Sequence, residues 1–124
     1  KKVASGGELS RVMLAIKSVL AEKDAISTLV FDEIDAGISG EVCRQVAGVL
    51  EQLATTHQLI CITHHAPIAA RAEQQISIRK TTSHGKTFTH LHPLKNRERL
   101  EELARMTGGE VNQASLNLAR RLME

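Results

Sequence analysis

Polar side chains follow two apolar runs in this 124-residue sequence, and their types suit chemistry on a phosphate group. Asp32 and Glu33 come directly after the run at residues 29–31, and His64 follows the run at residues 59–62. A carboxylate at a strand end could hold magnesium, directly or through water, and a neighbouring carboxylate could orient or deprotonate a water molecule. An imidazole could hydrogen-bond a phosphate oxygen or a water. Each group also has a plainer interpretation, as solvated carboxylates and a structural histidine.

A further candidate is Ser5-Gly6-Gly7-Glu8, which precedes a stretch of helical periodicity. Two glycines at a helix N-terminus expose backbone N–H groups in front of the positive end of the helix dipole, and Ser5 adds a hydroxyl donor, so this segment could bind an anion. The same residues fit a capping box, with Ser5 at the N-cap and Glu8 three positions later. On these residues alone, the cap and the anion site remain equal alternatives.

The segment at residues 35–40 separates the carboxylates from the next helical pattern. Its glycines, Gly37 and Gly40, permit positive φ angles and a close approach of the backbone. Taken by itself, this segment is most simply a turn followed by a helix start.

The elements that must position these residues form a βαβ unit. Residues 9–20 and 42–53 carry apolar side chains at helical spacing, which predicts two amphipathic helices. Short, fully apolar runs at 28–31 and 59–62 predict strands that are buried on both faces, as in a parallel sheet. Because ligands of open parallel sheets bind beyond the carboxyl ends of the strands, the polar residues after both strands are expected at one edge.

The rest of the chain predicts a hairpin between helices, on the basis of period-two alternation and glycine positions. Ser77 and three hairpin histidines (His84, His90 and His92) are interpreted as its solvated face, and no Ser-His-Asp triad can be built from them. The predicted elements are, in order, a short helix up to residue 71, hairpin strands at 75–79 and 86–91, and helices at 94–106 and from 112 to the end.

The composition favours a single α/β domain over residues 1–124, with a partly parallel sheet and flanking helices. Hydrophobic residues make up 42% and charged residues 24%, which excludes disordered, collagen-like and disulfide-scaffold classes. A net charge of +2 permits a nucleic-acid partner without arguing for one. Two Phe with no Trp or Tyr argue against a base-stacking platform. No apolar run approaches the ~18 residues of a membrane span.

Two further expectations concern the cysteines and the start of the chain. Cys43 falls in a helical pattern and Cys61 in a strand pattern, and both are predicted to be reduced thiols. The sequence starts at Lys1 without an initiator Met, so we expect it to be a piece of a longer protein.

Taken together and in order, the motifs resemble the second half of an ABC-type ATPase head. The matches are Ser5-Gly6-Gly7-Glu8 with the signature motif, residues 29–33 with the Walker B strand and its catalytic glutamate, residues 35–39 with the D-loop, and His64 with the switch histidine. Residues 3–11, 31–40, 62–64 and 99–109 further resemble the C-terminal part of the SMC-like RecN family of bacterial DNA-repair proteins. Ile34-Asp35 and Glu8 depart from the transporter branch of ABC ATPases.

The resemblance implies the C-terminal lobe of a P-loop NTPase head, with ATP and Mg²⁺ as cofactors of the intact protein. It implies that Asp32 holds magnesium through water, that Glu33 orients or activates the attacking water, and that His64 contacts the γ-phosphate. The ATP-binding residues that it implies are Ser5, Gly6, Gly7, Glu8 and Ser39, the signature residues acting on ATP held by a second head.

Function, partners and location also follow from the resemblance. It implies an ATPase of DNA double-strand-break repair and recombination in the bacterial cytoplasm, associated with the nucleoid. The implied partners are the N-terminal half of the same head, a second head in an ATP-dependent dimer and DNA, with no membrane. The chain contains no G-x-x-x-x-G-K-[ST] motif, so Walker A and a coiled coil are expected in the N-terminal half. This chain alone is therefore predicted neither to bind ATP tightly nor to hydrolyse it.

Other interpretations stay open. The chain could be a head fragment of another chromosome-maintenance or transport ABC ATPase, or a non-catalytic interaction module that docks through the apolar stripe at 9–20. A metal phosphohydrolase using Asp32, His64 and His65 ranks lower, because no further ligand follows a third strand. The basic residues of the last helices are interpreted as solvated faces; they are Lys95, Arg97, Arg99, Arg120 and Arg121.

Overall fold

A computed structural model describes residues 5–20 and 25–124. Val3 and Ala4, which begin the signature-like run, lie outside the described residues. The chain divides into two compact units, residues 1–71 and residues 72–124. The single domain over 1–124 that we expect from length and composition stays a prediction.

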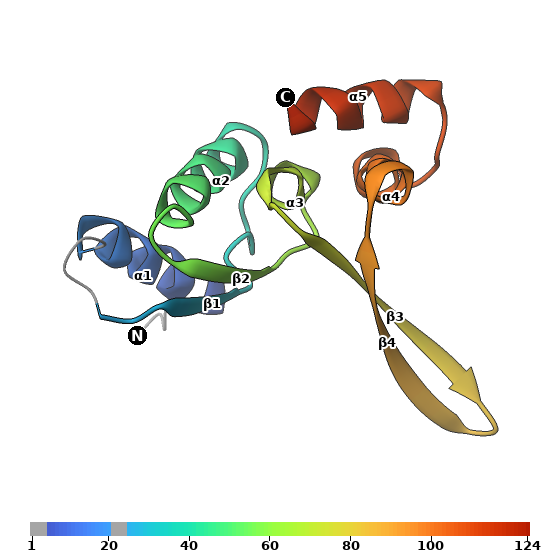
Figure 1. The fold of residues 1–124 in the computed structure, drawn as a ribbon, viewed down its shortest axis with the longest axis horizontal. Helices are drawn as coiled ribbons and strands as arrows, with labels where there is room; N and C mark the ends of the chain where they lie inside the picture. The colour runs from blue at the N-terminus through green and yellow to red at the C-terminus, as the bar shows by residue number, and fades with distance from the viewer. Residues whose placement is uncertain (1–4, 21–24) are drawn as a thin grey trace. The chain divides into compact units, whose positions relative to one another are not determined.

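The first unit is a parallel pair of strands with helices packed against it (Figure 1). Its elements are α1 (Gly6–Leu20), β1 (Thr28–Asp32), α2 (Gly40–Leu53), β2 (Gln58–Ile62) and α3 (Ala66–Arg71). In the register of the pair, Leu29 lies opposite Leu59 and Asp32 lies opposite Ile62. The predicted βαβ unit is confirmed, and the strand limits differ from the prediction by one residue.

One face of the strand pair carries the core of this unit, and the other face is exposed. The buried core residues are Leu14, Phe31, Ile34, Cys43, Val46, Ala47, Leu50, Leu53 and Ile68. On the opposite face, Val30 is 62% exposed, and Ile60 and Ile62 are each 49% exposed. The prediction that both faces are buried is therefore wrong for the described residues, because α1 and α2 contribute their buried side chains to one core and no described element covers the second face.

Helix α1 confirms the predicted cap but does not bury its apolar stripe. Gly7 and Leu14 are its buried residues. The stripe is exposed instead, from 46% at Leu20 to 85% at Val19; its other members are Leu9, Val12, Met13 and Ile16. An apolar surface of this extent on a folded protein marks an interaction site.

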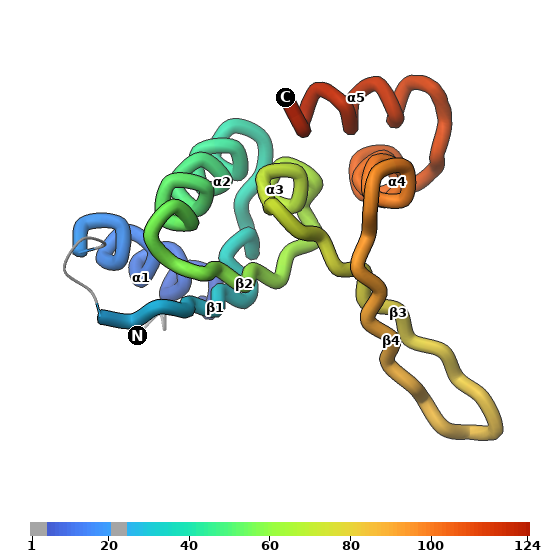
Figure 2. The backbone as a smooth tube through the Cα atoms, viewed as in Figure 1, coloured from blue at the N-terminus to red at the C-terminus, as the bar shows by residue number. Residues whose placement is uncertain are grey.

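The second unit consists of an antiparallel hairpin followed by two helices. Its elements are β3 (Gln75–Ser83), β4 (Lys86–Leu94), α4 (Asn96–Gly108) and α5 (Gln113–Met123). Ser83 pairs with Lys86 across a two-residue turn, in which His84 and Gly85 have φ angles of 49° and 73°. This turn matches the right-handed twist of the strands, and the hairpin extends away from α4 (Figure 2).

Two expectations for this unit need correction. Leu94 is buried and ends β4, and α4 begins at Asn96, because the hairpin continues three residues further than the alternation in the sequence indicated. Ser77 is 7% exposed and is not solvated, since it lies near the base of the hairpin. The three hairpin histidines are exposed, as predicted. Within the described ranges, every helix is too short or too polar to cross a membrane.

Candidate functional site

The candidate site lies at the edge of the sheet where β1 and β2 both end. Asp32 is the last residue of β1 and pairs with Ile62, the last residue of β2, so the chain leaves both strands at the same edge. Glu33 begins the segment after β1, and His64 lies two residues beyond β2. The roles that the sequence suggests for these residues stay predictions.

Glu33 has an unusual backbone conformation. Its φ angle is 54°, in the left-handed region, which costs a residue with a Cβ roughly 1–2 kcal/mol. The backbone N–H of Ala36 donates to the Glu33 carbonyl oxygen at 2.9 Å, which closes a turn after the strand. This turn leaves the side chains of Asp32 and Glu33 exposed. Strained residues of this kind concentrate at functional sites.

The N-terminus of α1 packs directly on this turn. The capping box is present: the Ser5 backbone N–H donates to Glu8 Oε2 at 2.8 Å, and the Glu8 N–H donates to Ser5 Oγ at 3.3 Å. The backbone hydrogen bond from Ser5, its hydroxyl and the nearby Arg11 charge hold the pKa of Glu8 below its ordinary value. The box satisfies two of the backbone donors at the helix start, the N–H groups of Ser5 and Glu8.

Gly7 lies too close to the backbone of the turn for any larger side chain, and Gly6 lies beside the end of the Glu33 side chain. A Cβ on Gly6 would lie 2.9 Å from Glu33 Oε2, and a Cβ on Gly7 would lie 2.7 Å from the Glu33 carbonyl oxygen and 2.8 Å from the Ala36 Cβ. The glycines therefore have a packing role in addition to the cap and the candidate anion site. This role was not apparent from the sequence, because Gly7 and Glu33 are 26 positions apart in the chain.

Ser10 and Arg11 tie α1 to the same segment, and sequence reasoning did not identify either of them. The Ser10 hydroxyl donates to the Asp32 carbonyl oxygen at 2.8 Å. Arg11 Nη1 donates to the carbonyl oxygens of Ile34 at 3.1 Å and Ala36 at 2.9 Å. The two side chains give otherwise irregular backbone three hydrogen-bond donors, so they fix the path of the chain just beyond β1.

Asp35 is the residue that joins the two strand ends. Its side chain is almost completely buried, at 1% exposed. Thr63 Oγ1 and the His64 backbone N–H, the latter at 3.1 Å, both donate to Asp35 Oδ2. His64 Nδ1 lies 3.5 Å from the same oxygen. Burial alone would raise the pKa of Asp35, but the hydrogen bonds from Thr63 and His64 outweigh it, and the pKa lies below its ordinary value of 3.8.

The segment between the carboxylates and α2 turns through Gly37 and Gly40. Their φ angles are 72° and 56°, a region that glycine adopts without steric cost. Ser39 is the N-cap residue of α2, yet its side chain makes no capping hydrogen bond. Its exposed hydroxyl is therefore available to a ligand or to a second protein, as the D-loop resemblance suggests.

Two groups of side chains suit metal ions of different kinds. The exposed Asp32 carboxylate has no side-chain partner among the described residues, and carboxylate oxygens are ligands that Mg²⁺ prefers, so it fits a magnesium role. Asp35, His64 and His65 form a second group, whose ligand atoms lie within 4.8 Å of one another. Imidazole suits transition metals better than magnesium. The metal-hydrolase alternative had grouped the two histidines with Asp32, whereas the described residues group them with Asp35.

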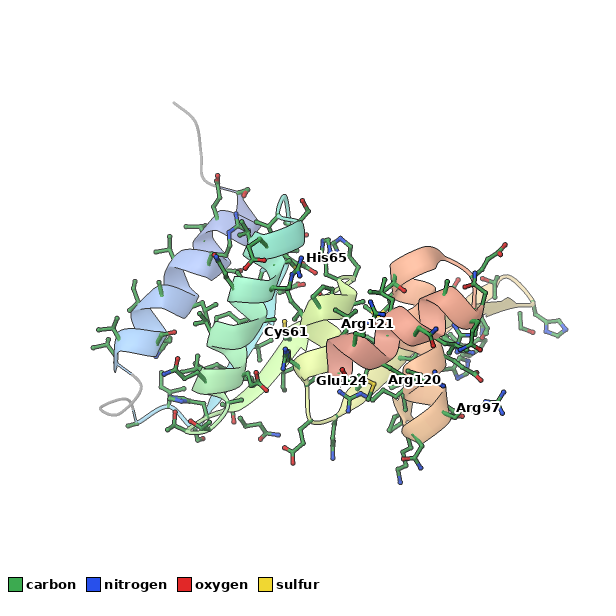
Figure 3. All side chains as sticks on the ribbon, turned by 90° about the horizontal axis from the view of Figure 1, so that it is seen from above. Cys61, His65, Arg97, Arg120, Arg121 and Glu124 are labelled. Carbon is green, nitrogen blue, oxygen red and sulfur yellow. The ribbon has the colours of Figure 1, made fainter. Side chains whose placement is uncertain are left out.

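Both cysteines are free thiols. Burial, followed by the negative charges of Asp35 and Asp32, raises the pKa of Cys61 to about 11. Burial and the charge of Asp35 also raise the pKa of Cys43. The Cys61 side chain, labelled in Figure 3, packs against the core.

The basic residues of the second unit are mostly solvated, as predicted. Arg97 pairs with Glu101 at 2.7 Å on α4, and Arg120 donates to Asn117 on α5; both arginines are labelled in Figure 3. Arg99 departs from the prediction because it is half-buried and donates to the Ala72 carbonyl oxygen. A groove of about 360 Å³ lies between α4 and α5, and its lining includes Arg97, Leu100 and Glu101 of α4, Val111, and Leu116 and Arg120 of α5.

Comparisons with known proteins identify relatives along nearly the whole chain. No family model matches. The chain is 48% identical to the DNA repair protein RecN of Deinococcus radiodurans over 121 residues, which is 98% of this chain and 21% of that protein. It is 47% identical to RecN of Treponema pallidum over 114 residues, 92% of this chain and 20% of that protein. It is 40% identical to RecN of Bacillus subtilis over 124 residues, which is 99% of this chain and 22% of that protein.

The fold also matches a solved structure. A chain from a study of ATP-driven dimerization and DNA-stimulated activation of SMC ATPases aligns with a TM-score of 0.61 at 22% identity. The alignment covers 84% of this chain and 62% of that chain. The α/β fold predicted from the sequence is confirmed by this match. The resemblance to the C-terminal part of RecN is confirmed by the sequence relatives. This chain spans about a fifth of the length of these relatives.

Proposed function

Starting from the similarity of this chain to the C-terminal part of RecN, we propose that it is the C-terminal lobe of an ATPase head in a RecN-like protein of DNA double-strand-break repair and recombination. In the intact protein, the head hydrolyses ATP to ADP and phosphate. The proteins that match this chain are named DNA repair proteins, and a solved chain of the same fold comes from work on SMC ATPases.

The observation that carries this proposal is the convergence of three segments at one sheet edge. The carboxylates of Asp32 and Glu33 follow β1, and His64 follows the neighbouring parallel strand β2. The glycines at the start of α1 pack against Glu33, with a would-be Cβ of Gly6 only 2.9 Å from the Glu33 carboxylate oxygen. Carboxylates, an imidazole and a glycine-rich helix start are the groups that hydrolysis of a phosphate anhydride needs.

In the proposed reaction, each residue has a separate task. Asp32 holds Mg²⁺ through water, and the ion, when bound, offsets the negative charge of the phosphates. Glu33 orients the attacking water and accepts its proton. His64 donates a hydrogen bond to the γ-phosphate, which stabilises the charge on its oxygens. Because phosphoryl transfer depends mainly on positioning and charge, these three side chains need partners that hold the nucleotide.

The nucleotide-holding partner is the N-terminal half of the same head, which carries Walker A. The uncovered face of the β1–β2 pair supports this partner, because Val30, Ile60 and Ile62 are each about half exposed or more. Exposed β-branched residues on a two-stranded sheet are unfavourable in water, and further strands with their own apolar face would bury them. The relatives contain about four-fifths of their length outside the matched region, which is ample for such a lobe.

A second head acts through the N-terminus of α1. Ser5, Gly6 and Glu8 are exposed and Gly7 is buried at the start of α1, where the positive end of the helix dipole favours an anion. These residues contact the γ-phosphate of ATP bound to the other head, and Ser39 lies in the loop that meets it. ATP thereby joins two heads, and hydrolysis requires both. DNA is the partner of the intact protein, which acts in the bacterial cytoplasm at the nucleoid.

The catalytic role is tested with magnesium-dependent ATP hydrolysis by the intact protein. Glu33→Gln keeps the shape of the side chain and removes its basicity, so turnover should fall by about 100-fold or more. Glu41→Gln is the matched control, because Glu41 is an exposed glutamate on the first turn of α2 that pairs with Arg44 at the surface. Equal turnover in both variants would contradict the assignment of Glu33. Residues 1–124 alone should show no turnover.

The role of the α1 N-terminus is tested at Ser5, with two substitutions that separate the cap from the anion site. Asp and Asn both cap helices well, so Ser5→Asp and Ser5→Asn preserve α1. The Asp carboxylate repels a phosphate, whereas the neutral Asn side chain does not. ATP-dependent dimerization, measured by light scattering in a Glu33→Gln background, should be lost only with Ser5→Asp. Dimerization that persists in both variants would favour a purely structural cap, since both side chains preserve it.

A non-catalytic docking module is the second candidate, because the apolar stripe of α1 is exposed. In that case, the intact protein would tolerate Glu33→Gln, while Val19→Glu on the stripe would abolish its function. Val19 is the most exposed member of the stripe, at 85%. Under the ATPase proposal, Glu33→Gln instead lowers turnover.

A further inference from the structure

Asp35 is a buried carboxylate that the reaction described above does not use. Its side chain is 1% exposed and belongs to the largest fully buried side chains of the described residues. Burying a carboxylate is costly unless hydrogen bonds replace the water that it loses. A neutral side chain could fill the same space at lower cost. The charge therefore needs an explanation, and its contacts supply one.

Within the described part of the chain, the residues that donate hydrogen bonds to the Asp35 side chain lie in the segment after β2. Thr63 Oγ1 donates to Oδ2, the His64 backbone N–H donates to the same oxygen at 3.1 Å, and His64 Nδ1 lies 3.5 Å from it. Thr63 Oγ1 in turn accepts a hydrogen bond from the His65 backbone N–H at 3.0 Å. One carboxylate oxygen thus organises three consecutive residues at the end of the neighbouring strand.

The arrangement also orients the imidazole of His64. The Nδ1 side of the ring faces the carboxylate, so Nε2 points away from it, and the side chain as a whole is 77% exposed. The ring of His65 lies beside it, with the centroids 4.3 Å apart and the planes tilted by 40°. A carboxylate opposite Nδ1 favours a proton on that nitrogen. The ring is therefore held on its Nδ1 edge, with its Nε2 edge open to a ligand.

We propose that Asp35 is a positioning residue, which holds the backbone of His64 and the Nδ1 edge of its ring so that Nε2 faces the γ-phosphate. Asp35 does not contact the nucleotide itself. The same residue joins the segment that carries Glu33 to the segment that carries His64, so the two catalytic groups keep a fixed separation. This inference rests on the proposed ATPase function.

The first test is the protonation of the His64 ring in the intact protein without nucleotide. Long-range ¹H–¹⁵N spectra of protein labelled with ¹⁵N-histidine, assigned with His64→Ala, report which ring nitrogen carries a proton. A protonated Nδ1 is expected in the wild type, with a weaker preference for Nδ1 in Asp35→Asn. A wild-type ring protonated on Nε2 alone would overturn the proposal. This measurement requires neither activity nor a folded Asp35 variant.

The second test is a double-mutant cycle on turnover in the intact protein. Asp35→Asn preserves the shape of the side chain and can still accept from Thr63 and the His64 N–H, but it carries no charge. It should lower kcat by about 10- to 100-fold, the usual effect of removing a carboxylate that orients a functional histidine, and it should leave KM within about twofold. In a His64→Ala background, the same substitution should change kcat by less than about twofold.

The cycle separates positioning from a merely structural role. If Asp35 only stabilised the fold, Asp35→Asn would lower turnover equally with and without the His64 side chain, and that result would overturn the proposal. Failure of the proposed function would give a different experimental result. It would appear as wild-type turnover that is absent or insensitive to Glu33→Gln, while the protonation of His64 would still report the contact with Asp35.

Discussion

Replacement of Gly7 by alanine tests how closely α1 must approach the segment that carries Glu33. The new Cβ would lie 2.7 Å from the Glu33 carbonyl oxygen and 2.8 Å from the Ala36 Cβ. Neither atom can rotate away, because one belongs to the backbone and the other is attached to it. Overpacking of this kind costs about 1–3 kcal/mol, and the upper end applies where backbone must move. The helix propensity of alanine returns at most ~1 kcal/mol.

The net destabilisation should therefore be about 1–2 kcal/mol, confined to α1 and the turn after β1. Hydrogen exchange of the intact protein, followed by mass spectrometry, measures such local opening directly. Peptides that cover these two segments should exchange about 5- to 30-fold faster in Gly7→Ala, since 1.4 kcal/mol corresponds to a factor of about ten. ATP turnover should fall as well, because the displaced backbone carries Glu33.

Gly48 provides the matched control within the same unit. It lies inside α2, it is exposed, and a Cβ there would meet nothing within 4 Å. Gly48→Ala should therefore stabilise α2 by up to ~1 kcal/mol and slow its exchange, with turnover unchanged. If Gly7→Ala behaved like Gly48→Ala, the close packing of α1 on the turn would be refuted as the reason for glycine at this position.

Three further predictions concern single side chains of the first unit. Arg11→Ala removes two hydrogen bonds to backbone carbonyl oxygens, so it should lower the free energy of local opening in the turn, measured by hydrogen exchange, by about 2 kcal/mol. Arg44→Ala breaks an exposed ion pair and should change the same free energy by under about 0.5 kcal/mol. Cys61, with a pKa of about 11, should react with iodoacetamide at pH 8 roughly 100-fold more slowly in the folded than in the unfolded protein, as mass spectrometry of the labelled peptide would show. Asp35 has a lowered pKa, so its stabilising contribution is fully present above pH 3.8 and is lost as the pH falls through its folded-state pKa. Acid unfolding can be monitored by circular dichroism. When each protein is compared with its own stability at neutral pH, the wild type should begin to unfold at a higher pH than Asp35→Asn.

The local features of the fold followed from the sequence, because short-range rules determine them. The capping box at Ser5 and Glu8, the parallel pair β1–β2 and the hairpin turn at His84-Gly85 each depend on residues within a few positions or on a simple periodicity. The order of the motifs at one sheet edge followed from the general rule for parallel strands. The position of these residues at one sheet edge could thus be predicted before any geometry was known, and their roles stay predictions.

The errors and omissions arise where distant parts of the chain meet. Burial on both faces of the strands was inferred from their apolar runs, but a run shows only that a surface prefers to be buried and not which polypeptide covers it. The contacts of Asp35 with Thr63, and of Arg11 with Ile34, join residues more than 20 positions apart and have no periodic signature. Asp35 was assigned only to a turn and to the D-loop resemblance, although a third carboxylate two positions after Glu33 was a signal of a role of its own.

The raised pKa values of the two thiols, Cys43 and Cys61, have a consequence for their reaction with oxidants. The thiolate is the nucleophile that attacks peroxide to form sulfenic acid, so a cysteine whose pKa is raised by burial and by neighbouring carboxylates reacts with peroxide more slowly than an ionised cysteine. Oxidation of Cys43 would place a polar group in a core whose other members are aliphatic or aromatic. Burial of the two sulfur atoms, together with the negative charge that organises the sheet edge, therefore also protects them from oxidation.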